Sequence, residues 1–259
     1  MKSLAFLLFS VALMGLTASF SDKGEVSLTC KVNACEKVDS IYLFEFNGVN
    51  FKKIKSAKTA DWQTYQFKLP ATNPRFYYVG LDPNKLKPVV LGTEENVTLN
   101  GSCQSFEGAL LPNSDLNKQY EGVKNSLNQH KNELGTLLRE NQAAEQTDNA
   151  EAMNAAALKL LALDKKRLRL LDSLKQVSPY FAKLAALNTY LSYMHHGSAD
   201  ETEMQYFAKN YFKQIDWKDA DYAHMPWVYE AVKTFALTLA GVSLPDAEVK
   251  AAIDKQLSL

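Results

Sequence analysis

The chain has 259 residues, in which 29 lysine and arginine residues balance 29 aspartate and glutamate residues. A neutral chain has no overall basic charge with which to hold a phosphate backbone, so the composition argues against a nucleic-acid-binding protein. With 22% charged and 46% hydrophobic residues, the chain has the composition of a globular protein. It is long enough to bury a core as one large domain or two small ones.

The first 21 residues have the layout of a secretory signal peptide. Lys2 supplies a positive charge, residues 4–16 form an apolar run, and small residues follow up to Ser21. The apolar run has about 13 residues, whereas a membrane-spanning helix needs about 20, which disfavours a membrane anchor. We therefore expect residues 1–21 to be cleaved from a bacterial protein that is periplasmic or secreted and keeps no transmembrane segment.

If the protein is exported, two of its three cysteines can form a disulfide, because an oxidising compartment permits one. Cys30, Cys35 and Cys103 form no C-x-x-C pair, so the usual dithiol redox motif is absent. The candidate disulfide joins Cys30 to Cys103 on neighbouring strands and leaves Cys35 as the free thiol. A bond between Cys30 and Cys35 is the alternative, and a third interpretation makes all three small buried hydrophobic residues.

Residues 22–105 alternate between apolar and polar positions in short segments spaced roughly ten residues apart. Turn signals such as Asn47-Gly48 and Asp82-Pro83-Asn84 separate the segments, which predicts an antiparallel, β-sandwich-like domain. Four lysines between positions 52 and 58 are interpreted as a solvated or edge-protecting strand face. The alternating apolar positions include Val26, Leu28, Cys30, Val32, Tyr42, Phe44, Phe46, Tyr65, Phe67, Leu69, Val97 and Leu99.

Residues 106–259 follow the period of helices and predict an α-helical domain. Two long helices, separated by a polar turn at residues 145–149, are expected to fold back as an antiparallel hairpin. Arg167 interrupts the apolar seam, so the hairpin is not a strict coiled coil. Further helices are expected from Ser178-Pro179 to His196, after Asp200, over residues 227–240 and from Ser243 to the end. The fold class is therefore α+β.

Few residues of the chain suggest chemistry. His195 and His196 are adjacent, so on a helix they point about 100° apart and are interpreted as capping residues rather than metal ligands. The carboxylate pairs Glu94-Glu95 and Asp219-Asp221 are interpreted as solvated loop charge. No catalytic motif, metal site or cofactor site is predicted, and the protein is not expected to be an enzyme.

An aromatic cluster near the C-terminus is the candidate ligand pocket. At helical spacing such residues are more often part of a core, which is the competing interpretation. The candidate pocket residues are Trp217, Tyr222, Trp227 and Tyr229.

The segments at residues 40–46, 51–58, 65–69, 74–81, 87–92 and 96–101 resemble, in order and spacing, a known bacterial domain. It is the N-terminal domain of unknown function that precedes the thioredoxin-like domain in envelope proteins of the thiol:disulfide interchange and alkyl hydroperoxide reductase/thiol-specific antioxidant group. The helical region is similar to the spacer that follows that domain. The thioredoxin-like domain with its W-C-x-x-C centre is absent from this sequence, so the resemblance transfers no catalytic residue.

The resemblance implies a non-catalytic envelope module that binds or positions a partner, which is another envelope protein or a small molecule. One alternative is a structural protein that forms homo-oligomers through the helical hairpin. Another is a small-molecule-binding envelope protein that uses the aromatic cluster. If the chain is the front part of a longer oxidoreductase, we expect a W-C-x-x-C motif to follow Leu259.

Overall fold

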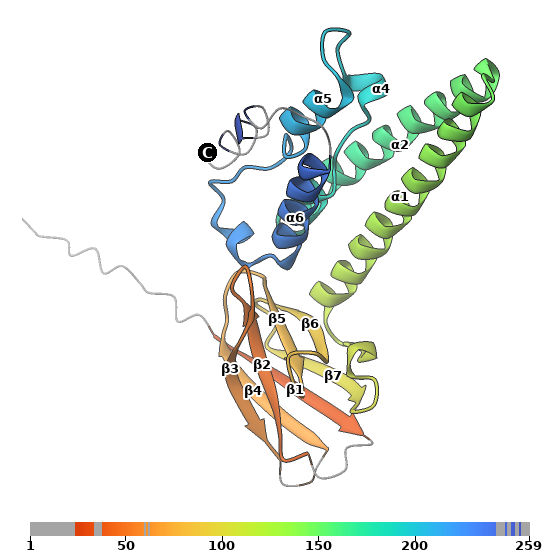
Figure 1. The fold of residues 1–259 in the computed structure, drawn as a ribbon. Helices are drawn as coiled ribbons and strands as arrows, with labels where there is room; N and C mark the ends of the chain where they lie inside the picture. Colours follow the sequence, from red (N-terminus) through yellow and green to blue (C-terminus); the bar gives the residue numbers. More distant parts are fainter. Residues whose placement is uncertain are drawn as a thin grey trace, which may run out of the picture.

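The computed structural model of the chain describes residues 24–33, 38–59, 61, 63–241, 247, 250, 251 and 254. Its strands form two sheets in the N-terminal part, and helices make up the rest (Figure 1). This arrangement confirms the predicted α+β fold with its long helical hairpin. The predicted signal peptide at residues 1–21 and Cys35 lie outside the described residues.

The strands lie in two stacked layers. One sheet has the order β4-β1-β7 and the other has the order β3-β2-β5-β6. Alternate residues of both sheets point inward and form a buried cluster that includes Leu28, Leu43 and Phe67. The strands are β1 (Glu25–Asn33), β2 (Ser40–Phe46), β3 (Phe51–Lys58), β4 (Thr64–Pro70), β5 (Arg75–Gly80), β6 (Leu86–Leu91) and β7 (Asn96–Ser102).

One strand pair differs from the antiparallel expectation. β1 and β7 run parallel, with Leu28 opposite Val97 and Cys30 opposite Leu99. Parallel neighbours need a long crossover, and here the connection between them contains all the other strands. The hydrophobic alternation could not reveal this, because it predicts which face of a strand is buried and says nothing of its neighbour's direction.

The long helical hairpin, which we call the arm, is formed by α1 and α2. α1 begins after the N-cap Ser114, and α2 begins after Asn149, whose side chain accepts a hydrogen bond from the Ala152 amide. No described helix is apolar over enough residues to cross a bilayer. The helices are η1 (Phe106–Gly108), α1 (Asp115–Gln146), α2 (Ala150–Val177), α3 (Pro179–Leu187), α4 (Tyr193–His196), α5 (Glu203–Asn210), η2 (Ala220–His224) and α6 (Pro226–Ala240).

The helix expected from Pro179 to His196 is interrupted, so this part of the prediction was wrong. α3 ends at Leu187 and α4 begins at Tyr193. At the break, Arg167 of α2 donates to the Tyr190 carbonyl and Asp164 accepts from the Ser192 amide. These two side chains take up backbone groups that a continuous helix would pair internally.

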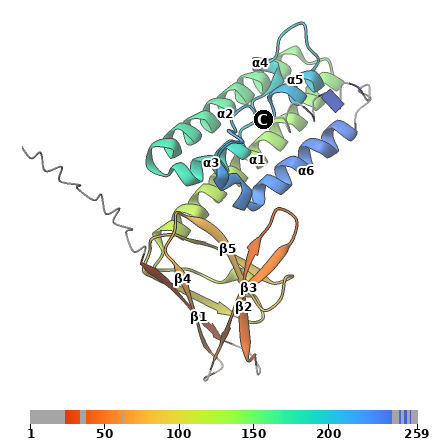
Figure 2. The ribbon, with the colours of Figure 1, turned by 90° about the vertical axis from the view of Figure 1, so that its left-hand side faces the viewer.

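The helices pack on one end of the sandwich rather than standing apart from it (Figure 2). Phe76 of β5 lies with its ring centre 5.2 Å from that of Tyr120 in α1 and 4.9 Å from that of Trp227 in α6. Sheet and helices therefore share one buried cluster. Of the last helix expected from Ser243, only four residues are described, all of them helical: Ala247, Lys250, Ala251 and Asp254.

Candidate functional site

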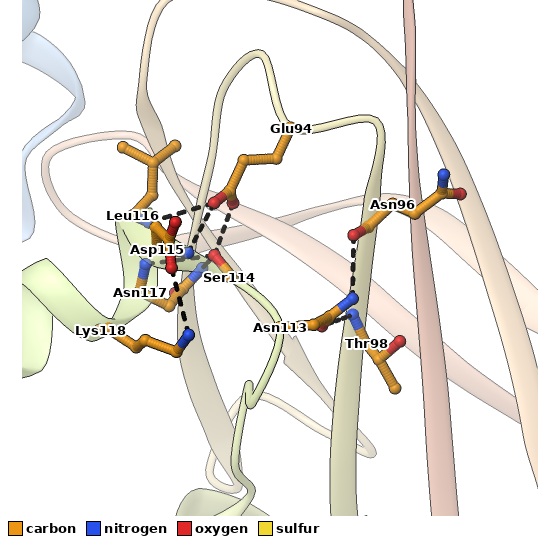
Figure 3. Close-up of polar contacts among 9 residues, drawn as sticks. All are labelled: Glu94, Asn96, Thr98, Asn113, Ser114, Asp115, Leu116, Asn117 and Lys118. Carbon is orange, nitrogen blue, oxygen red and sulfur yellow. Dashed lines mark hydrogen bonds and ion pairs between the residues drawn. The ribbon is translucent and has the colours of Figure 1, made fainter.

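The first turn of α1 is fastened to the sandwich by a cluster that we call the joint. It consists of Glu94, Ser114, Asp115, Leu116 and Asn117, together with the backbone of Val90. The Glu94 carboxylate accepts hydrogen bonds from the Ser114 hydroxyl at 2.5 Å and from the Asp115 amide at 2.7 Å (Figure 3). It also accepts from the Leu116 amide at 3.2 Å. A carboxylate at this place satisfies free amides at the start of α1 and is favoured by the helix dipole.

Asn117 links the joint to the edge of β6. Its side-chain amide accepts from the Val90 amide at 2.8 Å and donates to the Val90 carbonyl at 2.7 Å. Asn117 also donates to the hydroxyl of Ser114, and both side chains are buried. One side chain thus pairs both backbone groups of an edge-strand residue, as a neighbouring strand would.

A second asparagine closes the edge of β7 in the same manner. Asn113 accepts from the Thr98 amide at 2.8 Å and donates to the Asn96 carbonyl at 3.1 Å (Figure 3). Further along this edge, Asn100 and Leu110 exchange both backbone hydrogen bonds. The chain between β7 and α1 therefore covers the β7 edge before the joint binds β6.

The joint was not predicted from the sequence. Glu94 was interpreted as solvated loop charge, which was wrong, because its carboxylate binds Ser114, the N-cap residue of α1. The two residues are twenty positions apart, so no local pattern connects them. An acidic residue between two strands and a Ser-Asp helix start are each common.

A second polar cluster binds the α3–α4 connection to α2. Asp164, only 2% exposed, accepts from the Ser192 amide at 3.0 Å and from its hydroxyl at 2.6 Å. His196 Nε2 lies 3.4 Å from the same oxygen, and Arg167 Nη1 lies 3.8 Å from the other oxygen. The Ser192 hydroxyl donates to a carboxylate rather than to an imidazole, so this is not the arrangement of an activated nucleophile.

The two adjacent histidines lie where α4 meets α2. His195 Nε2 lies 2.7 Å from the Ala157 carbonyl oxygen, while His196 faces Asp164. They contact different groups of α2, as their difference in direction on a short helix predicts. Among the described residues, no group of three or more His, Cys, Asp or Glu side chains is placed to hold a metal ion.

The acidic pair near η2 also has a structural partner. Lys183 of α3 lies 2.6 Å from Asp219 and forms a second ion pair with Asp221. The interpretation of this pair as solvated loop charge was therefore wrong, because both carboxylates face a half-buried ammonium group. Together they fasten η2 to α3.

The candidate aromatic residues do not line one described cavity. Trp217 and Tyr222 have ring centres 5.7 Å apart, and both belong to the cluster shared by sheet and helices. Trp227 belongs to the same cluster but packs against Phe76 and Tyr120, while Tyr229 is exposed beside Phe46. The structure thus brings two of the four together and uses the other two to join α6 to the sandwich.

Cys30 is a free, buried thiol, which contradicts both the predicted Cys30–Cys103 bond and the Cys30–Cys35 alternative. Cys30 follows the alternation of β1 and points into the core between the sheets. Cys103 is disulfide-bonded, and its amide donates to the Asn33 carbonyl at the end of β1. The interpretation of all three cysteines as small buried hydrophobic residues is therefore wrong for Cys103.

We expect one free thiol, at Cys30, and a bond between the other two cysteines of the sequence, Cys35 and Cys103. Burial raises the pKa of Cys30 to about 12, so its thiol stays protonated and unreactive in the folded protein. Alkylation before and after unfolding, followed by non-reducing peptide mapping, checks this. Alkylated Cys103 in the native, unreduced protein would contradict the pairing.

His130 of α1 lies in the seam of the arm, and its Nδ1 atom is buried without a partner. Burial lowers the pKa of His130 below its ordinary value, the charge of Arg167 lowers it further, and Glu133 opposes the shift. The unfolded chain therefore takes up the proton at a higher pH than the folded protein does.

The free energy of unfolding should consequently fall as the pH drops from about 7 to about 5, through the ordinary histidine pKa. His130→Gln should make this dependence weaker. Urea unfolding of both proteins at several pH values measures it. An identical pH dependence in the two proteins would show that His130 takes no part.

The chain was compared with known proteins. No family model matches it, no curated protein matches it, and no solved structure matches it.

Proposed function

We propose that this chain is a non-catalytic module of the bacterial cell envelope that positions a partner, with the sandwich as its base and the arm as the positioning element. The observation that carries the proposal is the joint. Three hydrogen bonds to Glu94 and two between Asn117 and Val90 tie the first turn of α1 to the sandwich. An arm held in this manner has one direction relative to its base.

The arm is long. α1 has 32 residues, and a helix rises about 1.5 Å per residue, so it extends roughly 48 Å. Away from the sandwich, the ion pairs Lys159–Glu140 and Lys166–Glu133 link α1 to α2. A small apolar cluster of Leu137, Leu160 and Leu163 holds the same region together. These contacts support an arm that keeps its shape along its length.

The envelope location and the thiol-redox context come from the sequence. The signal-peptide pattern at residues 1–21 supports export, and the segment pattern of residues 40–101 resembles the module that precedes thioredoxin-like domains. Within that context, the module would hold a redox partner at a set distance from the sandwich, without supplying a redox centre of its own.

A distance measurement tests the positioning role. Nitroxide labels at Lys85→Cys and Glu151→Cys, in a Cys30→Ala background, report the distance between the sandwich and the far end of the arm. We expect one narrow distance distribution, which Glu94→Ala broadens because it removes the carboxylate from the joint. Asp172→Ala, an exposed change on α2, is the control and should leave the distribution narrow. A broad distribution in the otherwise unchanged protein would overturn the proposal.

An activity assay tests the proposal that the chain is not catalytic. Purified protein with dithiothreitol should not accelerate the reduction of insulin disulfides beyond the rate with dithiothreitol alone. A thioredoxin serves as the positive control. Acceleration that survives Cys30→Ala would place redox chemistry elsewhere in this chain and would end the claim.

Exposed leucines on the arm favour one second candidate, a structural protein that forms homo-oligomers through the hairpin. Leu138 is 50% exposed and Leu158 is 68% exposed, and each would be expected to face a partner if the arm packed against another copy. Light scattering over a range of concentrations separates the candidates. A strict monomer would exclude the oligomer, whereas a dimer that Leu138→Ser and Leu158→Ser dissociate would support it.

A further inference from the structure

A β-bulge in the β2–β3 pair places Lys53 and Lys58 on the same face of the sheet. Phe44 pairs with Lys53 and Leu43 pairs with Lys55, so Ile54 is the extra residue between them. Without the bulge, Lys53 and Lys58 would point to opposite faces, because they are five positions apart in one strand.

The shared face is the outer one. Phe44 belongs to the cluster beneath the helices, whereas Leu43 belongs to the core between the sheets. The outward residues of β2 are Phe44, Tyr42 and Ser40, and their partners on β3 are Lys53, Ser56 and Lys58. The positions opposite Lys53 and Lys58 on β2 are Phe44 and Ser40, with Tyr42 midway between them. Four residues of strand span about 13 Å, so the two lysines lie on either side of Tyr42 along the strand.

Both lysines lack a carboxylate partner among the described residues, although many other lysines of the chain have one. Lys53 instead places its ammonium group 4.4 Å from the centre of the Tyr42 ring, in a cation–π contact. Protection of the strand edge accounts for Lys55, which reaches the Lys68 carbonyl on β4. It does not account for Lys53 and Lys58, because these project from the sheet face.

Tyr42 and Lys58 line an open hollow of about 670 Å³. This volume lies in the range of small-molecule sites. The hollow is at the Ser40 end of β2, whereas α6 contacts Phe46 at the other end of the strand through Tyr229. Its lining combines one aromatic ring, one ammonium group, one carboxylate and three hydroxyls, and comprises Val38, Asp39, Ser40, Tyr42, Lys58, Thr59 and Leu81.

We propose that this hollow, the Tyr42 hollow, binds an acidic sugar, a pyranose ring that carries a carboxylate. The ring would stack against Tyr42, and its carboxylate would pair with the free ammonium group of Lys58. The sugar hydroxyls would donate to Asp39 and exchange hydrogen bonds with Ser40 and Thr59. The site lies at the end of the sandwich opposite the arm, so it is independent of the positioning role.

The lining also sets a preference. A neutral sugar would leave Lys58 without a partner, and a small inorganic anion would leave Tyr42 uncovered. The Lys53 ammonium group contacts the Tyr42 ring and adds positive charge near the site. An acidic disaccharide should therefore bind more tightly than a neutral disaccharide or free phosphate, and its affinity should fall with added salt.

Titration of the isotope-labelled protein with digalacturonate, followed by amide NMR, tests the proposal. We expect saturable shifts confined to residues 38–43 and 55–59, with a dissociation constant on the order of 1 mM for an open site. Lys58→Met and Tyr42→Leu should each weaken binding by about tenfold, the loss expected when one good contact is removed. Thermal unfolding of each variant shows whether it is folded.

Lys131→Met is the matched control, because Lys131 is also an exposed lysine without an ion pair but lies on α1. It should leave the affinity unchanged. The neutral disaccharide maltose and inorganic phosphate should bind at least about tenfold more weakly. Absence of saturable shifts, shifts at another place, equal affinity for maltose, or equal effects of Lys58→Met and Lys131→Met would each overturn the proposal.

Discussion

Asn117→Leu is expected to lower the free energy of unfolding by about 3–5 kcal/mol. The substitution removes the two hydrogen bonds between the Asn117 side chain and Val90, and a third to Ser114. It leaves a buried backbone amide and a buried carbonyl without partners, each of which costs about 1–3 kcal/mol. Urea unfolding followed by far-ultraviolet circular dichroism measures the change.

Asn128→Leu is the matched control, the same substitution on the same helix at an exposed position that makes no described hydrogen bond. Its effect should stay within about 0.5 kcal/mol. Asn117→Asp should be intermediate, because a carboxylate still accepts from the Val90 amide but cannot donate to its carbonyl. If Asn117→Leu and Asn128→Leu destabilise equally, the joint does not hold α1 to the sandwich.

An asparagine pairs with one edge strand of each sheet, β7 and β6, for a physical reason. Its side-chain amide carries one acceptor and one donor with nearly the geometry of a peptide group, so it pairs with an edge strand as backbone does. Asn113 does this on β7 and Asn117 on β6, within four positions of each other. The start of α1 is therefore tied to both sheets, which is what a base for a protruding arm requires.

The sequence predicts those parts of the fold that depend on local hydrophobic period. Alternation identified β1 and β4, and steps of three and four identified both helices of the arm. The polar residues 145–149 marked the turn of the hairpin, which the structure places at residues 147–149. These predictions succeed because each strand or helix buries one face, and that burial sets the spacing of its apolar residues.

Pairings between distant residues were not predictable in this manner. The parallel neighbour of β1 lies some seventy residues away, and the partner of Ser114 lies in the loop before β7. The cysteine pairing failed for the same reason. Alternation placed Cys30 correctly inside the sandwich, but the register sets Cys30 opposite Leu99, four positions before Cys103, and alternation does not determine register. Such contacts depend on which elements become neighbours, and period does not contain that information.

Asp164→Ala is expected to lower the free energy of unfolding by about 3–5 kcal/mol, the range for breaking a buried charged cluster from one side. The change removes both hydrogen bonds to Ser192 and leaves the Arg167 guanidinium buried without its acidic neighbour. Arg167→Met should cost less, because the ion pair is long at 3.8 Å and Arg167 makes one hydrogen bond, to Tyr190. Burial also lowers the pKa of Arg167, with Asp164 and Glu133 opposing it, so its charge is poorly solvated there.

The difference in stability loss between Asp164→Ala and Arg167→Met shows whether the cluster mainly anchors the backbone at Ser192 or mainly pairs charges. If Asp164 acts mainly on Ser192, the double variant with Arg167→Met should remain nearly as unstable as Asp164→Ala alone. Hydrogen exchange should then show lost protection in residues 189–196, while the first turn of α1 keeps its protection. Asp172→Ala, on the exposed side of α2, should change stability by less than about 0.5 kcal/mol. Full rescue of Asp164→Ala by Arg167→Met would show instead that the unpaired guanidinium causes the loss, and the break between α3 and α4 would then need another explanation.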